Sequence, residues 1–392
     1  IGAGYTGLSS ALHLAEAGKD VIIIDQAQPG WGASGRNGGQ VNPNWKALPE
    51  SIRPYYPDAQ FKQMIELVNT TTDLVFDLIE KHQIRCEAKR SGYVMGVIGR
   101  ENLAYIRSWA DQWQTTDRNV EILDRQTIAD LLGTGHYDGG MLDRRGGSVQ
   151  PLSYARGLAR ACLDQGVKIY GHSPALAVTA LADGWRIKTP QGEIRCRSLV
   201  IGTNGYTDQL WPGLARCIVP VASLITATRP LPADIAAHIL PQRQVVSTSA
   251  GLPVYYRMDE NNRMIFGGRG AISGNFANLD TRKLRKQAIA LFPALAAARW
   301  EYDWGGYVAM TTHHRPLLLN LGDNAYAGLG YNGRGIAMAT LMGKQLALAA
   351  SDQKTDLAQE SMQTIPFHRL RSIGIAGRMI GGRIKDWSTR RI

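Results

Sequence analysis

The first residues of the chain carry a glycine pattern that restricts the possible folds. Residues 2–7 have the spacing GxGxxG, whose glycines allow a tight turn, a close approach to a pyrophosphate and close packing of the next helix. Apolar residues recur at helical spacing over 8–15, and 21–24 form a short apolar run typical of a buried strand. An acid, Asp25, ends that run. The order of turn, helix, strand and acid predicts a unit that binds a dinucleotide.

Asp25 has a specific use at such a site. Its carboxylate can accept hydrogen bonds from both hydroxyls of an adenosine ribose while the helix N-terminus faces the phosphates. The same negative charge would repel a 2′-phosphate, so NADP is disfavoured. The dinucleotide site predicted from this segment consists of Gly2, Gly4, Tyr5, Thr6, Gly7, Asp25 and Gln26.

A second glycine-rich stretch follows at once and favours FAD over NAD. Residues 30–39 contain five glycines, which let backbone amides approach a flat ring system and a pyrophosphate, and Arg36 is available for negative charge. An NAD-binding fold does not need such a stretch here, and a flexible surface loop is the alternative. The candidate residues are Gly32, Ala33, Ser34, Arg36, Asn37, Gly38, Gly39 and Gln40.

These motifs resemble the D-amino-acid-oxidase-type superfamily of FAD-dependent oxidoreductases, and within it the gamma-glutamylputrescine oxidoreductase group. The matching segments cover most of the chain: GASGRNGG at 32–39, YxR followed by RxxFGG at 255–268, WGG at 304–306 and GLGYNGRGI at 328–336. The resemblance implies an α/β fold in which a glutathione-reductase-like Rossmann FAD-binding lobe is interleaved with a mixed-sheet substrate lobe. It also implies that the chain is an FAD-dependent amine oxidoreductase.

The resemblance assigns further cofactor contacts. The loop before the helical pattern at 337–349 would lie beside the pyrimidine end of the flavin, where the helix dipole stabilises the anionic reduced ring. A glycine-rich turn before a core helix is the plainer alternative for this loop. The implied residues are Ala175, near the adenine, then Thr203, Asn204, Gly205, Gly330, Tyr331, Asn332, Gly333, Arg334, Gly335 and Ile336.

A coarse secondary-structure pattern supports interleaved domains. It predicts a helix over 151–162, short strands at 167–170, 176–181, 185–189 and 193–197, a mostly helical stretch over 52–137, and mixed strands and helices over 219–300. We expect FAD-binding segments at 1–51, 146–218 and 301–392, the last ending in a basic tail. The substrate segments are expected at 52–145 and 219–300.

The substrate site is harder to assign from sequence. Flavin-dependent amine oxidation removes a hydride from the carbon that bears nitrogen, so the protein must chiefly position a neutral amine and exclude water, without an obligatory acid–base motif. For each candidate, the alternative is an ordinary role in the core or at the surface. Chosen by position, the candidates are Tyr255, Tyr256, Arg257, Tyr307, His313 and Arg315, with Trp304 and His314 beside them.

Two departures from relatives restrict the substrate and the cofactor linkage. Oxidases of small amino acids usually have a carboxylate-binding arginine where this chain has Tyr307, which disfavours glycine-like substrates. We expect an extended amine resembling gamma-glutamylputrescine. A cyclic or N-alkyl amino acid such as L-pipecolate stays open, since Arg257 or Arg315 could bind its carboxylate. Met310 stands where sarcosine-oxidase-like members attach FAD through cysteine, so non-covalent FAD is expected.

Composition limits the remaining classes of function. The net charge of +11 is partly concentrated between Arg369 and Arg391, which include seven Lys/Arg and one acid, but no nucleic-acid-binding motif accompanies it. The apolar runs are too short to span a bilayer. Four cysteines without metal-like spacing indicate reduced thiols, no metal site and a cytoplasmic setting.

Two rival classes and the electron acceptor stay open. A flavin hydroxylase that uses NAD(P)H would need a second dinucleotide-binding unit. The GxGxxG spacing recurs at 30–35 and 328–333, but both segments are already assigned to FAD. A non-catalytic flavoprotein subunit is the other alternative. The small-molecule amine could pass its electrons to oxygen or to another acceptor.

Overall fold

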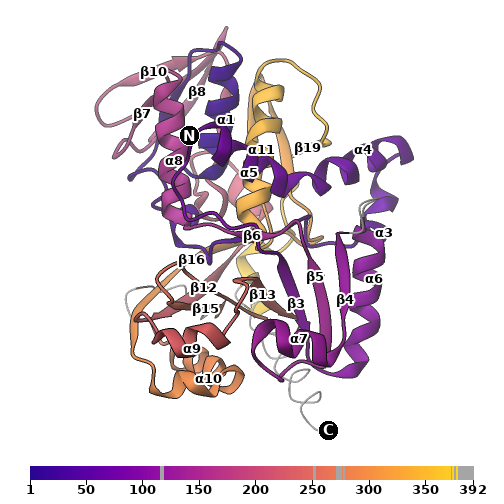
Figure 1. Cartoon of the computed structure of the whole chain (residues 1–392). Coiled ribbons are helices and arrows are strands. Elements are labelled where there is room, and N and C mark those ends of the chain that lie inside the picture. Colours follow the sequence, from indigo (N-terminus) through magenta and orange to yellow (C-terminus); the bar gives the residue numbers. More distant parts are fainter. Residues whose placement is uncertain are drawn as a thin grey trace.

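The elements form two lobes, one above the other in Figure 1, which shows the computed structural model of the chain. The structure describes residues 1–114, 119–249, 253–270, 276, 279–371, 373–374 and 377. In the described part of the chain, no helix has both the length and the apolarity needed to cross a membrane. The upper lobe contains α1 (Tyr5–Glu16), α8 (Pro151–Asp164), α11 (Gly335–Ala350), β1 (Ile22–Ile24), β7 (Lys168–Tyr170), β8 (Ala177–Leu181), β9 (Gly184–Lys188), β10 (Glu193–Cys196), β11 (Leu199–Ile201), β17 (Leu317–Gly322), β18 (Ala325–Leu329) and β19 (Gln359–Ser361).

The central sheet of the upper lobe is assembled from three distant parts of the chain. β1 pairs in parallel with β7, and β11 pairs in parallel with β18, which is followed by β17 and β19. The first two residues join these groups, because the Gly2 amide donates to the Ile24 carbonyl at 2.8 Å and the Gly202 amide donates to the Ile1 carbonyl at 2.9 Å. The glycine turn therefore lies in the middle of this sheet.

Helices α1 and α11 pack closely on one another. A Cβ atom added at Gly343 of α11 would lie 2.5 Å from Cβ of Ser9, and the Ser9 hydroxyl donates to the Thr340 carbonyl at 2.7 Å. Only a glycine allows the two backbones to come this close. α8 packs on α1, and α5 (Thr71–Lys81) packs on α11.

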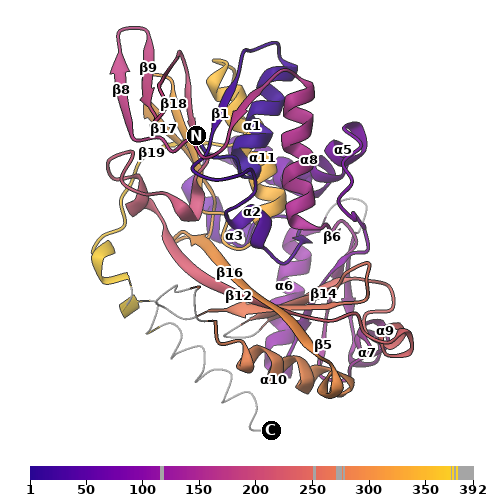
Figure 2. The same cartoon turned by 90° about the vertical axis from the view of Figure 1, so that its left-hand side faces the viewer.

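The lower lobe is built on a mixed sheet of eight strands. Its far face, which points away from the upper lobe, is covered by α7 (Arg125–Leu132), α9 (Ala233–His238) and α10 (Arg282–Leu291) (Figure 2). The strand order is β16 (Trp300–Met310), β12 (Val219–Thr228), β15 (Met264–Arg269), β14 (Val254–Met258), β13 (Val245–Ser249), β3 (Tyr93–Val97), β5 (Gly139–Asp143) and β4 (Val120–Leu123).

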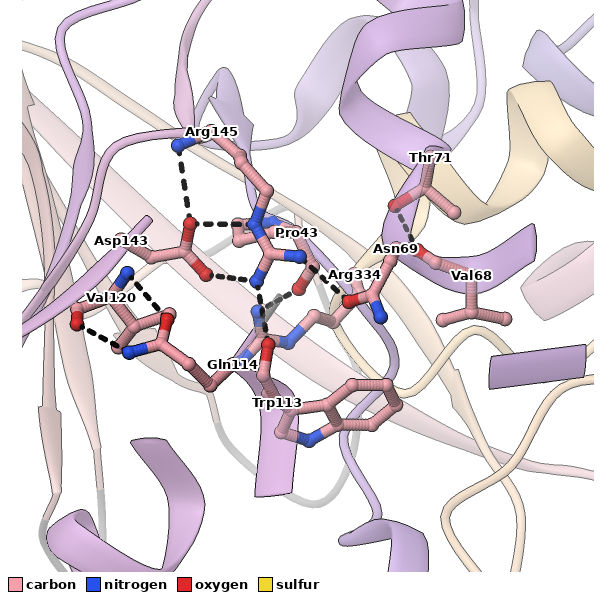
Figure 3. A network of polar contacts seen from close by, with 10 residues as sticks. All are labelled: Pro43, Val68, Asn69, Thr71, Trp113, Gln114, Val120, Asp143, Arg145 and Arg334. Carbon is pink, nitrogen blue, oxygen red and sulfur yellow. Dashed lines mark hydrogen bonds and ion pairs between the residues drawn. The ribbon is translucent and has the colours of Figure 1, made fainter. Parts of the chain in front are cut away.

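A buried ion pair fixes the edge of the lower lobe next to α6 (Leu103–Trp113) (Figure 3). Arg145 contacts Asp143, at the end of β5, with Nη2 and Oδ2 2.7 Å apart, and both side chains are buried. The same guanidinium donates to the Asn69 side chain at 2.6 Å and to the Trp113 carbonyl at 3.2 Å. The pair thus links β5 to the C-terminal ends of α4 (Asp58–Asn69) and α6.

Short elements connect the lobes. β2 (Gln40–Val41) pairs antiparallel with β6 (Gly147–Ser148), and two short helices lie on either side of β2 in the sequence, α2 (Ala33–Arg36) and α3 (Pro49–Ile52).

Most predicted elements of the upper lobe are confirmed. The helix predicted at 151–162 is α8, the four strands predicted between 167 and 197 are β7 to β10, and the pattern at 337–349 is α11. The stretch 52–137 is mostly helical as predicted, but it also contains β3 and β4. Every residue of β3 is buried, so the strand lacks the alternation of apolar and polar residues that marks a half-buried strand.

The predicted domain division stays a proposal, with one change. β16 pairs with β12 from its first residue, Trp300, to its last, Met310. We therefore extend the second substrate segment from 219–300 to Met310. The predicted basic tail lies mostly outside the described residues.

Candidate functional site

One cavity of about 790 Å³ is lined by residues of both lobes. Its volume lies within the roughly 300–1,000 Å³ usual for small-molecule and cofactor sites. Most of the residues predicted for the cofactor and substrate sites line it: Gly2, Gly4, Tyr5, Thr6, Asp25, Gln26, Gly32, Ala33, Ser34, Arg36, Asn37, Gly38, Gln40, Ala175, Thr203, Asn204, Tyr255, Tyr307, Tyr331, Asn332, Gly333, Arg334, Gly335 and Ile336.

The N-terminus of α1 forms one wall of the cavity. Gly2 adopts φ +100°, and a Cβ atom at Gly7 would lie 1.9 Å from the Gly2 carbonyl oxygen. The N-cap residue is Gly4, which has no side chain to cap the helix, and no acidic residue lies in the first turn. The helix dipole and the first amides are therefore left for an anionic group such as a phosphate.

Asp25 is held rigidly beside this wall. Its Oδ2 accepts the Ala3 amide at 2.7 Å, and its Oδ1 accepts the Ala27 amide at 2.8 Å. A carboxylate oxygen can accept more than one hydrogen bond, so both oxygens keep capacity for ribose hydroxyls. Gln26 and Ala175 line the same part of the cavity.

The glycine-rich segment is organised by Asn37. Its Nδ2 donates to the Ser34 carbonyl at 3.0 Å, and its Oδ1 accepts the Gly39 amide at 2.9 Å. Arg36 lies over the Trp31 ring, 4.7 Å from the centroid. These contacts shape a turn whose backbone faces the cavity.

Gly38 and Gly39 make room for two side chains of β14. A Cβ atom at Gly38 would lie 2.7 Å from the Tyr255 ring, and one at Gly39, where φ is +75°, would lie 2.7 Å from Nε of Arg257. That Nε donates to the Gly38 carbonyl at 2.7 Å. The motifs at 32–39 and 255–257 are thus physically coupled.

The loop before α11 forms the opposite wall. Gly330 and Gly333 adopt φ of +77° and +89°, and α11 begins at Gly335 with neither a side-chain cap nor an acidic residue in its first turn. The Tyr331 hydroxyl lies 2.7 Å from the Thr6 hydroxyl, which links this loop directly to α1. Two uncapped helix N-termini therefore open onto one cavity.

The large sheet forms the floor with aromatic rings and hydroxyls. The Tyr255 hydroxyl lies 2.8 Å from the Ser223 hydroxyl, and the Tyr93 hydroxyl lies 2.6 Å from that of Ser247. Ser247 is directly opposite Tyr255 in the register of β13 and β14, so the two pairs are neighbours. At the other end of the floor, the Tyr307 ring contacts the ring of Tyr206, with centroids 5.5 Å apart.

Tyr256 and Arg257 do not line the cavity, which corrects the sequence-based positions. Tyr256 points to the far face because side chains alternate along β14, and its hydroxyl lies 2.8 Å from that of Tyr137. Its ring stacks on Phe266, with centroids 5.5 Å apart. The Arg257 side chain donates a hydrogen bond to the Gly38 carbonyl, and burial lowers the pKa of Arg257.

His313 and Arg315 also lie off the cavity. Arg315 forms an ion pair with Glu360 and a hydrogen bond to the Tyr56 hydroxyl, which ties the segment after β16 to β19. Burial, with Arg315 and His314 as smaller influences, lowers the pKa of His313 to about 4. Of the predicted glycines, four support the walls without lining the cavity: Gly7, Gly39, Gly205 and Gly330.

Sequence reasoning missed several lining residues. Tyr206 directly follows the turn predicted at 203–205, so it could have been predicted from sequence. Ser223 and Ser247 could not, because their position depends on the register of the large sheet. The residues from β3, from α6 and the N-cap before it, and from the segment after β2 carried no motif. These are Asn42, Lys46, Tyr93, Asn102, Tyr105 and Trp109.

The donor set fits a flavin adenine dinucleotide. Two helix N-termini and Arg36 suit the pyrophosphate and the reduced ring, and Asp25 suits a ribose. Cβ atoms added at Gly333 and Gly335 would meet nothing within 4 Å, so the backbone there lies open to a flat ring. Among the described residues, no three His, Cys, Asp or Glu side chains form a group that could hold a metal ion.

Fold and cavity together define a flavin-dependent oxidoreductase. A family model for DAO, the FAD dependent oxidoreductases, matches residues 1–349. The chain belongs to this family, and FAD is its cofactor. The predicted family resemblance is thereby confirmed.

Named relatives agree with this membership. The chain is 32% identical to the probable oxidoreductase OrdL of Haemophilus influenzae over 355 residues, or 89% of this chain and 81% of that protein. It is 29% identical to gamma-glutamylputrescine oxidoreductase of Escherichia coli over 350 residues, or 88% and 82% of the two chains. Glycine oxidase from Geobacillus kaustophilus shares the fold, with a TM-score of 0.74 at 19% identity over 91% of this chain and 95% of that chain. The predicted α/β fold class is confirmed.

Proposed function

We propose that the chain oxidises an extended amine resembling gamma-glutamylputrescine to the corresponding imine. The observation that carries the proposal is the floor of the cavity, which runs from Tyr307 on β16 to Tyr93 on β3 and thus crosses six neighbouring strands. Bound FAD supplies the acceptor for the hydride that leaves the carbon bearing nitrogen. A floor of this length suits a long substrate better than glycine or sarcosine.

The side chains at the floor suit binding and orientation. Burial raises the pKa of Tyr255 to about 12, so its hydroxyl stays protonated and acts as a hydrogen-bonding group, not as a base. Tyr255, Tyr307 and Tyr206 offer ring faces and edges to the methylenes of an alkylamine and exclude water from it. The amine must therefore arrive neutral or lose its proton on binding.

The charges around the cavity favour an amine that also carries an anionic group. Among the described lining residues, the acids are Asp25 and Asp208, and the lysines and arginines are Arg36, Lys46, Arg269 and Arg334. A bare diamine with two positive charges gains little in such a lining. L-Pipecolate, the main competitor, loses the support expected from Arg257 and Arg315, because neither lines the cavity.

The proposal is tested by reduction of the bound flavin. Anaerobic mixing of the holoenzyme with gamma-glutamylputrescine, N-acetylputrescine, putrescine, L-pipecolate, proline, sarcosine and glycine should bleach the flavin fastest with the first. Efficient reduction by glycine or sarcosine, with none by the longer amines, would overturn the assignment. Peroxide formation on admission of air would identify oxygen as the acceptor.

Two smaller parts of the proposal concern the cofactor and the setting. FAD is bound non-covalently, so acid precipitation should release all the yellow colour; colour fixed to the pellet by a covalent bond would contradict this. We place the reaction in the cytoplasm, which is supported by the four cysteines being free thiols.

A further inference from the structure

We infer that the cavity contains a second subsite that binds an α-amino-acid head group at the end of the substrate remote from the oxidised amine. The distal subsite consists of Asn42, Lys46, Tyr93, Tyr105, Trp109 and Arg334, all of which line the cavity. The inference rests on the proposed function for the identity of the amine end. It names the substrate class as amines joined to an amino acid.

Arg334 supplies a buried positive charge to this subsite. Its side chain is 7% exposed, and its guanidinium carbon lies 5.1 Å from the Tyr93 ring centroid and 5.3 Å from that of Trp109. One of its nitrogens donates to the Pro43 carbonyl. Within the described residues, no acidic side chain forms an ion pair with it. A buried guanidinium held between aromatic rings is suited to a carboxylate brought by a ligand.

Asn42 provides a second, independent sign of a ligand. Its side chain is 8% exposed, and its Oδ1 is buried without a hydrogen-bond partner among the described residues. A buried carbonyl oxygen without a donor costs free energy unless a ligand or water supplies one. The ammonium group of an α-amino acid is such a donor, and its carboxylate would at the same time reach Arg334. Lys46, exposed at the same part of the cavity, adds a second positive charge.

The spacing along the floor fits an amine joined to this head group. Tyr255 on β14 and Tyr93 on β3 are separated by two strand steps across the sheet and by two residues along it, which together give about 12 Å. Nine bonds join the terminal nitrogen of gamma-glutamylputrescine to its glutamyl α-carbon, which in extended form is about 11 Å. The amine would thus lie over Tyr255 when the head group lies at Arg334.

The wall of the distal subsite is firmly anchored. Tyr105 and Trp109 are four residues apart on α6 and share one face of the helix. The C-terminal end of that helix is held by the Arg145 guanidinium at the Trp113 carbonyl, and Figure 3 shows Arg334 reaching Pro43 beside this network. A rigid wall favours recognition of one head group over simple accumulation of anions.

The test uses two ligands that lack the terminal amine of the proposed substrate. γ-Glutamylbutylamide carries the amino-acid head group, and N-butylacetamide has the same amide without it. Their dissociation constants are measured from the absorbance change of the flavin in the holoenzyme. We expect the first to bind roughly 10- to 100-fold more tightly than the second, and this ratio to fall about 10-fold in both Lys46→Met and Arg334→Gln.

Matched controls remove the same charges elsewhere. Lys62→Met, on α4, and Arg107→Gln, on the exposed side of α6, lie outside the cavity and should leave the ratio unchanged. FAD content is determined for every variant. Lys46 lies far in sequence from the loop before α11, so Lys46→Met keeps the test decisive if Arg334→Gln loses FAD.

The outcomes separate this inference from the proposed function. An equal ratio in the unmodified protein and both variants, or no binding of γ-glutamylbutylamide by the unmodified holoenzyme, would overturn the distal subsite. A retained ratio with no oxidation of gamma-glutamylputrescine would overturn the proposed reaction alone, because neither probe carries the terminal amine that the proposed reaction oxidises.

Discussion

At the scale of single residues, Asp25 combines a structural and a binding role. Asp25→Ala leaves the amides of Ala3 and Ala27 without their acceptor and removes the predicted contact with the ribose. Hydrogen bonds to a charged group contribute about 1.5–3 kcal/mol each, so we expect FAD affinity to fall at least 10-fold. Titration of the apoprotein with FAD measures the change.

A conservative variant is the control for Asp25. Asp25→Asn keeps one acceptor oxygen and the shape of the side chain, so its FAD affinity should lie between those of the unmodified protein and Asp25→Ala. Equal FAD affinity in all three proteins would remove Asp25 from the site.

At the scale of elements, the turn at Gly38 and strand β14 must fit one another. The three atoms nearest to a Cβ at Gly38 all belong to the Tyr255 ring, the closest at 2.7 Å. Gly38→Ala should therefore destabilise the holoenzyme by about 1–3 kcal/mol, the usual cost of overpacking. Adding Tyr255→Ala should restore most of that loss, measured by chemical denaturation as a double-mutant cycle.

Gly39 provides the contrasting control. Its φ of +75° is strained for any other residue, and a Cβ there would lie 2.3 Å from the Val149 carbonyl oxygen, which belongs to the backbone. Arg257→Ala should therefore fail to rescue Gly39→Ala. Absence of rescue at Gly38 would show that the Tyr255 ring does not restrict that position. Rescue at Gly39 would show that the Arg257 side chain, and not the backbone, restricts it.

An element can be predicted from the sequence when residues close to it in the chain determine its structure. The turn at 2–7, α1 and α11 follow from glycine spacing and helical periodicity, and all were predicted. The orientation of β14 was not, because two adjacent tyrosines give no sign of which one faces the cavity. That choice depends on Phe266, which lies opposite Tyr256 in the pairing of β14 with β15, and on Tyr137, which is 119 positions away in sequence. The distal subsite was not predicted either, because its residues come from elements that only the fold brings together.

At the scale of the whole molecule, the Asp143–Arg145 pair fixes the lower lobe at the cavity. Asp143→Ala leaves a buried guanidinium without its counter-ion, which typically costs about 3–5 kcal/mol. Chemical denaturation of the holoenzyme should show this loss. It should also weaken binding of ligands that reach Trp109, since α6 loses part of its anchor.

The matched control is an exposed pair one residue away in sequence. Arg144 and Glu121 form an ion pair with side chains 62% and 44% exposed. Glu121→Ala should cost about 0–1 kcal/mol, because water and salt screen such pairs. Equal losses in Asp143→Ala and Glu121→Ala would contradict a special role for the buried pair.

The contact between α1 and the loop before α11 also bears on when the cofactor site can form during protein synthesis. Thr6 and Tyr331, whose hydroxyls meet at 2.7 Å, are 325 positions apart in sequence. The glycine turn of a nascent chain therefore lacks its packing partner until most of the polypeptide has left the ribosome. Contacts of such long sequence separation form slowly. We therefore expect FAD to bind only after the loop before α11 has left the ribosome.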